Sequence, residues 1–76
     1  MKYIVELQKG VWLAGWRWPW RAPGDEPTRT LARENALRLA SVDDAFTELA
    51  FARLYKPFKN ARICEELEKV IDSAVV

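Results

Sequence analysis

The stretch YIVELQKGVWLA, residues 3–14, decides the fold. Its first half alternates between two sets of side chains, which are Tyr3, Val5 and Leu7 on one side and Ile4, Glu6 and Gln8 on the other. This period of two is typical of a half-buried strand over residues 2–8. Lys9-Gly10 indicates a tight turn, because glycine adopts positive φ without strain. Residues 11–14 return as a second strand, so the stretch predicts a β-hairpin.

Residues 41–57 carry a complete helix pattern. Ser41 is a good N-cap, since its hydroxyl can accept a hydrogen bond from the amide of Asp43 or Asp44. Both carboxylates also suit the positive end of a helix. An apolar stripe at helical spacing follows, made of Val42, Ala45, Phe46 and Leu49. Pro57 disfavours helical conformation in the residue before it, so the helix is expected to end near Tyr55.

The segment before this helix has two interpretations. Residues 28–36 contain good helix formers and also alternate, so they fit either a helix or a strand. Leu37 and Leu39 flank Arg38, which favours a third strand in the second half of the region.

After the helix, Asn60 indicates a turn and residues 62–64 a further strand. Leu67, Val70 and Ile71 have helical spacing, so residues 67–76 are expected to form a short helix or a frayed tail. The sum is an α+β fold, a small antiparallel sheet covered by one helix in the order β-β-β-α-β, with a short C-terminal helix as an option. Residues 1–76 are expected to form a single domain.

The composition excludes several classes of function. The chain has 76 residues, a net charge of +1, one cysteine and no histidine. It therefore lacks the commonest general base and the commonest metal ligand, and it has no thiol–imidazole pair. No glycine-rich phosphate-binding motif is present. The sequence predicts a protein that is not an enzyme and that needs no cofactor or metal.

The cysteine content and the N-terminus bear on the compartment. One cysteine, Cys64, forms no internal disulfide, and we expect it to be a small buried hydrophobe. Glu6 interrupts the first apolar run, so no signal peptide is expected. No apolar run approaches the ~18 residues of a membrane span. These observations favour a cytoplasmic protein without a membrane partner.

The stretch GWRWPWRAPGDEP, residues 15–27, is rich in tryptophan and proline and reads as a loop or an edge-strand extension. Three tryptophans occupy alternate positions and Trp12 has the same parity, so alternation in an extended strand places four indoles on one face: Trp12, Trp16, Trp18 and Trp20. The arginines of the stretch, Arg17 and Arg21, would face the other way. Burying three indoles is worth roughly 10–20 kcal/mol as an upper bound, so we expect them to be covered.

Two kinds of cover are compatible with the pattern. The indoles either pack on this chain's own sheet or contact a partner, since Trp and Arg are enriched at binding hot spots. The predicted partner-binding residues are Trp16, Arg17, Trp18, Trp20 and Arg21. The expected partner is a protein, including a second copy in a homodimer.

The alternative is an accessory protein for single-stranded nucleic acid. Stacking indoles would combine with a basic strip, made of Arg17, Arg21, Arg29 and Arg33. Asp25 and Glu26 in the same loop oppose this function. A second basic cluster, Lys56, Lys59 and Arg62, is either solvated surface or a site for an acidic partner.

Several fragments resemble small uncharacterised proteins encoded by bacteriophages and prophages. The resemblance covers residues 2 to about 65, and its most specific pieces are GVWLA, the acid-and-proline turn before RTL, and PFKNARI. The segment GWRWPWRAP is longer and more aromatic than in that group. The resemblance implies a strand followed by a capped helix around LRLAS and a phage-associated accessory role. It implies no activity and no site residue.

Overall fold

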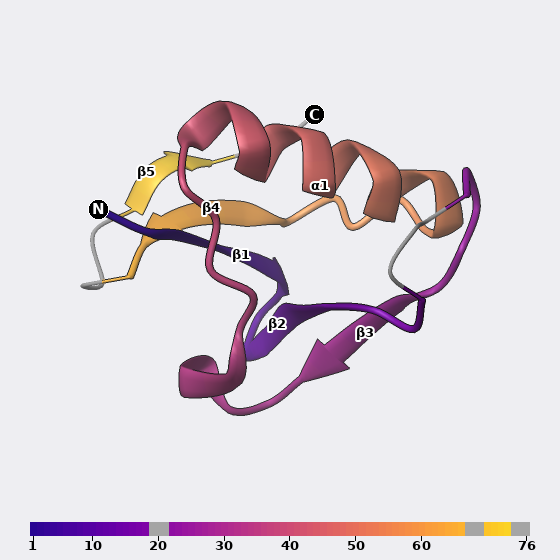
Figure 1. The fold of residues 1–76 in the computed structure, drawn as a ribbon, viewed down its shortest axis with the longest axis horizontal. Coiled ribbons are helices and arrows are strands. Elements are labelled where there is room, and N and C mark those ends of the chain that lie inside the picture. Colours follow the sequence, from indigo (N-terminus) through magenta and orange to yellow (C-terminus); the bar gives the residue numbers. More distant parts are fainter. Residues whose placement is uncertain (19–21, 67–69, 74–76) are drawn as a thin grey trace.

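The computed structural model describes residues 1–18, 22–66 and 70–73, and it contains a five-stranded antiparallel sheet with one α-helix. The sheet order is β3-β2-β1-β4-β5 (Figure 1). The elements are β1 (Tyr3–Gln8), β2 (Val11–Trp16), β3 (Pro27–Thr30), the 3-10 helix η1 (Arg33–Asn35), α1 (Val42–Tyr55), β4 (Arg62–Glu65) and β5 (Val70–Ser73). The predicted α+β class and the single covering helix are confirmed.

The N-terminal hairpin forms as its sequence predicts. β1 is the central strand and pairs with β2 on one side and β4 on the other. Val5 and Leu7 face the helix and join the main core, while Ile4 belongs to a cluster on the opposite face. The turn residue Gly10 has φ +76°, the positive value for which glycine is suited. β2 runs two residues beyond the expected end and includes Trp16.

Helix α1 begins and ends where its pattern predicts. The Ser41 hydroxyl accepts a hydrogen bond of 3.1 Å from the amide of Asp44, and the helix ends at Tyr55. The predicted buried stripe is wrong at Phe46, which is 40% exposed. The residues buried against the sheet are Ala45, Leu49 and Ala52. These three positions lie on one side of the helix, and Phe46 lies about 100° around the helix axis from Ala45.

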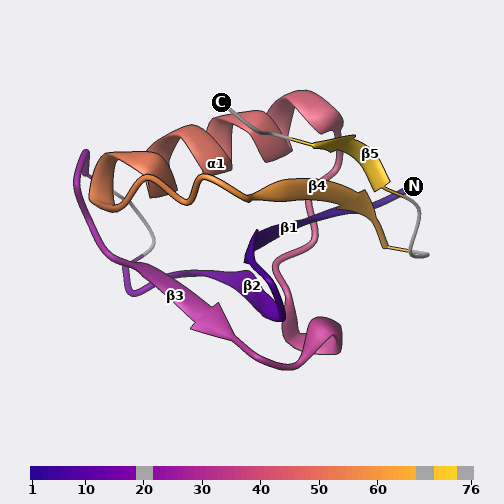
Figure 2. The same cartoon turned by 180° about the vertical axis from the view of Figure 1, so that it is seen from behind.

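The main core lies between α1 and one face of the sheet (Figure 2). It brings together residues from three strands, the helix and the loop after the helix: Val5, Leu7, Leu13, Ala45, Leu49, Ala52, Phe58, Ala61 and Ile63. Trp16, Tyr3, Leu37 and Leu39 pack at its margin. In the described part of the chain, no helix has the length and apolar character needed to cross a membrane.

The third strand lies earlier in the chain than the sequence predicts. β3 occupies Pro27–Thr30, and the predicted strand at residues 37–39 makes only an isolated bridge between Leu39 and Tyr3. Residues 28–36 are therefore neither one helix nor one strand. Pro27 is tolerated because β3 is an edge strand, where a missing N–H group breaks no ladder.

The second face of the sheet is also covered, which the sequence pattern did not indicate. Residues 33–36, which include η1, cover a second core of Ile4, Trp12, Ala36 and Cys64, whereas Leu37 and Leu39 pack at the margin of the main core. The Arg33 guanidinium carbon lies 4.8 Å from the centre of the Trp12 ring. Arg33 also donates to the carbonyl oxygens of Glu65 and Glu66, at 3.0 and 3.3 Å. One arginine thus connects the covering segment to the end of β4.

The spacing of Val70 and Ile71 predicts a C-terminal helix. No helix forms over the described residues 70–73. This segment is strand β5, which pairs antiparallel with β4. An edge strand that begins with the β-branched residues Val70 and Ile71 satisfies the outer backbone groups of β4, and that gain outweighs a weak helical spacing. The remaining residues of the predicted 67–76 element lie outside the described residues.

Candidate functional site: the Trp/Arg groove

A β-bulge in β2 decides which way each tryptophan points. Leu13 is opposite Arg29 and Gly15 is opposite Thr28, so Ala14 is an extra residue in β2. One extra residue reverses the alternation of all side chains that follow. Gly15 has φ +134°, a backbone conformation that other residues rarely adopt.

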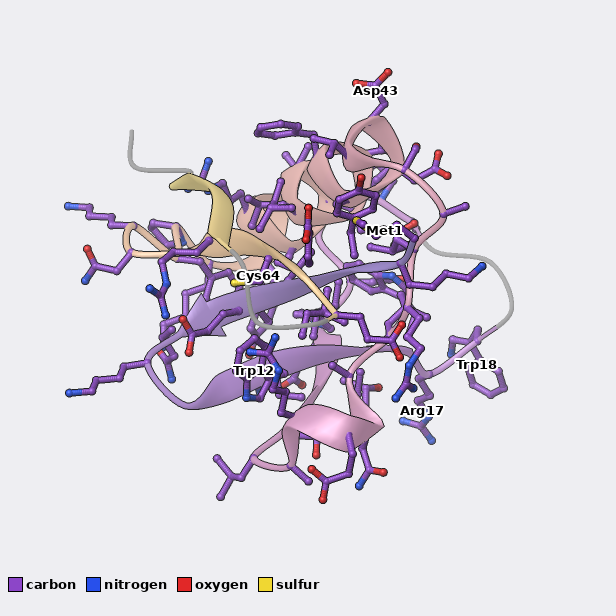
Figure 3. The ribbon with its side chains drawn as sticks, turned by 90° about the vertical axis from the view of Figure 1, so that its left-hand side faces the viewer. Met1, Trp12, Arg17, Trp18, Asp43 and Cys64 are labelled. Atoms are coloured by element: carbon purple, nitrogen blue, oxygen red, sulfur yellow. The ribbon has the colours of Figure 1, made fainter. Side chains whose placement is uncertain are left out.

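The predicted stripe of indoles on one face is therefore wrong. Trp12, before the bulge, lies in the second core, and Trp16, after it, packs at the margin of the main core on the helix side. Trp12 lies on the side of the sheet toward η1, and Trp18 projects outward at a distance from it (Figure 3). The four indoles cannot form one patch.

Trp16 is held in place by the helix. Its indole N–H donates a hydrogen bond of 2.7 Å to Oε1 of Glu48. The side chain is half-buried, and Pro27, its neighbour on β3, is buried. Trp16 therefore forms a fixed base on which the following residues are presented.

Arg17 and Trp18 follow this base and lie at the surface. Trp18 is 54% exposed, and the Arg17 guanidinium carbon lies 5.3 Å from the centre of its ring. A cation over an indole face at this distance is attracted by the ring quadrupole. The pair presents a large apolar surface and a positive charge side by side.

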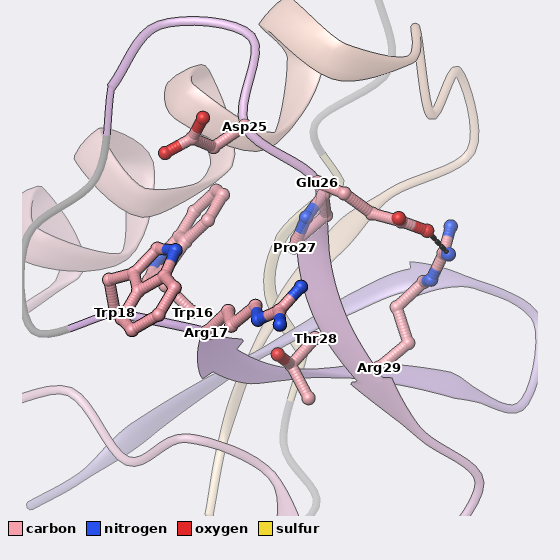
Figure 4. Close-up of a pocket in the computed structure, with 8 residues that line it drawn as sticks. All are labelled: Trp16, Arg17, Trp18, Asp25, Glu26, Pro27, Thr28 and Arg29. Carbon is pink, nitrogen blue, oxygen red and sulfur yellow. Dashed lines mark hydrogen bonds and ion pairs between the residues drawn. The ribbon is translucent and has the colours of Figure 1, made fainter.

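These residues border a groove of about 540 Å³, named here the Trp/Arg groove. It is lined by the end of β2, the start of β3 and the turn before it: Trp16, Arg17, Trp18, Asp25, Glu26, Pro27, Thr28 and Arg29. Arg17 extends toward Thr28, while the Glu26–Arg29 ion pair lies across β3 (Figure 4). The Asp25 carboxylate accepts a hydrogen bond of 2.8 Å from the amide of Ala22, which closes the turn.

The groove is electrically balanced. Two arginines and two carboxylates line it, and Arg29 is paired with Glu26. The Arg29 guanidinium carbon also lies 5.7 Å from the centre of the Tyr55 ring at the end of α1. Arg17 differs from Arg29, because its guanidinium lies over the Trp18 ring and forms no ion pair with any described residue.

The structure brings three of the five predicted partner-binding residues together, Trp16, Arg17 and Trp18. Trp20 and Arg21 lie outside the described residues. Arg29, which belongs with Arg17 to the predicted basic strip, also lines the groove, whereas the sequence pattern did not indicate Thr28. Arg33, part of the predicted basic strip, lies on the other face of the sheet over Trp12.

A second ionised pair lies on the face of the sheet opposite the helix. Glu6 is 5% exposed, and its carboxylate accepts hydrogen bonds from the Arg62 guanidinium and, at 3.2 Å, from the amide of Gly10. The hydrogen bond and the charge of Glu6 raise the pKa of Arg62. This pair joins the hairpin turn to β4, so its role is structural.

Cys64 is buried in the second core, as its sequence context predicts. Burial raises the pKa of the thiol, because the charged thiolate loses its hydration there. Within the described ranges, no group of three or more acidic, cysteine or histidine side chains lies close enough together to hold a metal ion.

We expect Cys64 to react with a thiol reagent at pH 8 about a hundredfold or more slowly in the folded chain than in the urea-unfolded chain, since reaction requires a local opening. The raised pKa also stabilises the fold below the ordinary thiol pKa of about 8.5, and this contribution is lost as the pH rises above it. The reaction is followed by the absorbance of the coloured thiolate that an aromatic disulfide reagent releases when it reacts with Cys64. Equal rates with and without urea would contradict the buried placement.

No protein-family model matches this chain, and neither a curated protein nor a solved structure matches it. The resemblance to bacteriophage proteins therefore stays a prediction.

Proposed function

We propose that this chain is a small non-enzymatic binding protein that contacts a protein partner through the Trp/Arg groove, with Arg17 and Trp18 at the centre of the contact. The observation that carries the proposal is the pair itself. A 54% exposed indole lies beside a guanidinium at the edge of a groove of about 540 Å³. Trp and Arg are the residue types that most often dominate binding free energy at protein interfaces.

The rigidity of the surroundings supports the same function. Trp16 is anchored on Glu48, and the Asp25 carboxylate closes the turn on the far side of the groove. A side chain presented from a fixed base loses less conformational entropy on binding. The partner can be a second copy of this chain, since β3 is an edge strand and a two-fold axis would place two grooves together.

The charge balance favours a protein over a nucleic acid. Asp25 and Glu26 line the same groove as Arg17, and Arg29 is paired with Glu26. Phosphate binding needs a surplus of positive charge, because its affinity comes largely from the release of counterions.

Comparative capture with three baits tests the proposal: the wild-type chain, Trp18→Ala and Leu31→Ala. Leu31 is the matched control, because it is 81% exposed and lies outside the groove. We expect a protein, foreign or a second copy, to bind the wild type and Leu31→Ala and to bind Trp18→Ala at least about tenfold more weakly, as at a hot spot. Sedimentation equilibrium of each variant measures the contribution of self-association.

The proposal would be overturned if wild type and Trp18→Ala captured the same proteins in the same amounts and also had the same molar mass in sedimentation equilibrium. Binding of an oligothymidylate that weakens steeply with salt and is lost in Trp18→Ala would also overturn it, in favour of a nucleic-acid surface.

A further inference from the structure

A hollow of about 260 Å³ lies where the loop after α1 meets the end of β1. Its lining is formed by two short segments, Leu7 with Gln8 and residues 56–60. Leu7 and Phe58 are buried core residues beneath the hollow, so the exposed Pro57 supplies its accessible apolar surface, named here the floor. The volume is below the roughly 300–1,000 Å³ of small-molecule pockets, and it suits a side chain of a polypeptide better than a free ligand.

The rim of this hollow is positive. Lys56 and Lys59 belong to the lining, which contains no carboxylate, and Lys9 follows Gln8 directly. None of these three lysines forms an ion pair within the described residues. The nearest acidic side chain along β1, Glu6, is buried and is bound to Arg62 and Gly10. Three lysine charges outweigh the roughly half negative charge of the helix end at Tyr55.

The loop that carries the lysines has a defined shape. Phe58 has φ +44°, which is unfavourable for a residue with a bulky side chain, and it is held there by its burial in the main core. Its carbonyl oxygen accepts from the amide of Ala61 at 3.1 Å and from Arg53 at 3.4 Å. The Lys56 ammonium lies 6.0 Å from the centre of the Phe58 ring. The two lysines are therefore presented from a fixed turn.

We propose that this hollow binds an acidic polypeptide segment, with one apolar side chain of the segment on the Pro57 floor and the flanking carboxylates on Lys56 and Lys59. The charge of the rim selects carboxylates, and the apolar floor selects a segment in which an apolar residue lies between acids. Phe58 is 5% exposed, so it offers no open ring for base stacking, and this disfavours a nucleic acid. The site is separate from the Trp/Arg groove and does not depend on the function proposed for it.

Fluorescence anisotropy with a fluorescein-labelled peptide of sequence DELDED tests the proposal. We expect saturable binding that weakens between 50 and 200 mM salt. Lys59→Glu and Lys56→Glu should each weaken binding about three- to tenfold, as expected for reversing one exposed charge partner. Lys2→Glu is the matched control, since it makes the same change of charge at an exposed site near the N-terminus, and it should change binding less than about twofold. Thermal unfolding of each variant checks that the fold is kept.

Two further probes examine the floor and the kind of ligand. Peptide DEGDED, which lacks the apolar side chain, should bind more weakly than DELDED, and the uncharged peptide NQLNQN should not bind measurably. Equal losses for Lys59→Glu and Lys2→Glu, or equal binding of DELDED and DEGDED, would overturn the proposal, because only general charge attraction would then be involved. Tighter binding of an oligothymidylate of the same charge would overturn it as well, in favour of a phosphate-binding surface.

Discussion

Trp12→Ala is expected to lower the free energy of unfolding by about 3–5 kcal/mol, as is typical of a large aromatic removed from a core. Trp12 is 7% exposed and is the largest member of the second core. Its removal also takes away the ring beneath Arg33, which connects the covering segment to β4. A chain of 76 residues has a total stability of about 4–11 kcal/mol, so this variant should be near the limit of folding.

Trp18→Ala is the matched control for this change. Trp18 is 54% exposed, so its removal should change the free energy of unfolding by less than about 0.5 kcal/mol. Urea unfolding followed by circular dichroism measures both variants. Similar losses for Trp12→Ala and Trp18→Ala would contradict the placement of the two indoles in different environments.

Leu49→Ala is expected to lower the free energy of unfolding by about 2–5 kcal/mol. Leu49 is 1% exposed, and it is the largest helix residue in the core between α1 and the sheet. The helix makes its other buried contacts through Ala45 and Ala52, which have little side chain to adjust. A cavity at position 49 would therefore remain largely unfilled, which places the effect in the upper part of the range.

Leu54→Ala makes the same chemical change in the same helix. Leu54 is 59% exposed, so the change should be within about 0.5 kcal/mol of the wild-type value. Thermal and urea unfolding of the two variants form the comparison. Equal destabilisation would mean that helix propensity, and not packing against the sheet, sets the stability of α1.

Local signals predicted much of the fold. The hairpin follows from the alternation of β1 and from the turn at Gly10, and α1 follows from its cap at Ser41 and from Pro57. Each of these signals acts over a few residues, and at each one a single type of secondary structure is favoured. β3 and β5 had no such unambiguous signal, because β3 begins with a proline and the spacing of Val70 and Ile71 also fits a helix, so pairing with the preceding β-strand decides both.

The candidate site was predicted in composition but not in geometry. Arg17 and Trp18 lie at the surface, as a partner-binding strip requires. Alternation failed to place Trp12 and Trp16, because it assumes that every residue of β2 has an opposite residue in β3. Arg29 was named with Arg17 in the predicted basic strip, but the pairing of β3 with β2 that brings Thr28 and Arg29 to the groove was not predicted.

The bulge at Ala14 acts as a phase shift within one strand. Before it, Trp12 lies in the second core and Leu13 in the main core; after it, Trp16 packs at the margin of the main core and borders the groove. A substitution at an exposed position after Trp16 can therefore alter the surface without repacking the residues around Trp12. A six-residue strand thus packs into the cores through its first half and borders the Trp/Arg groove through its second.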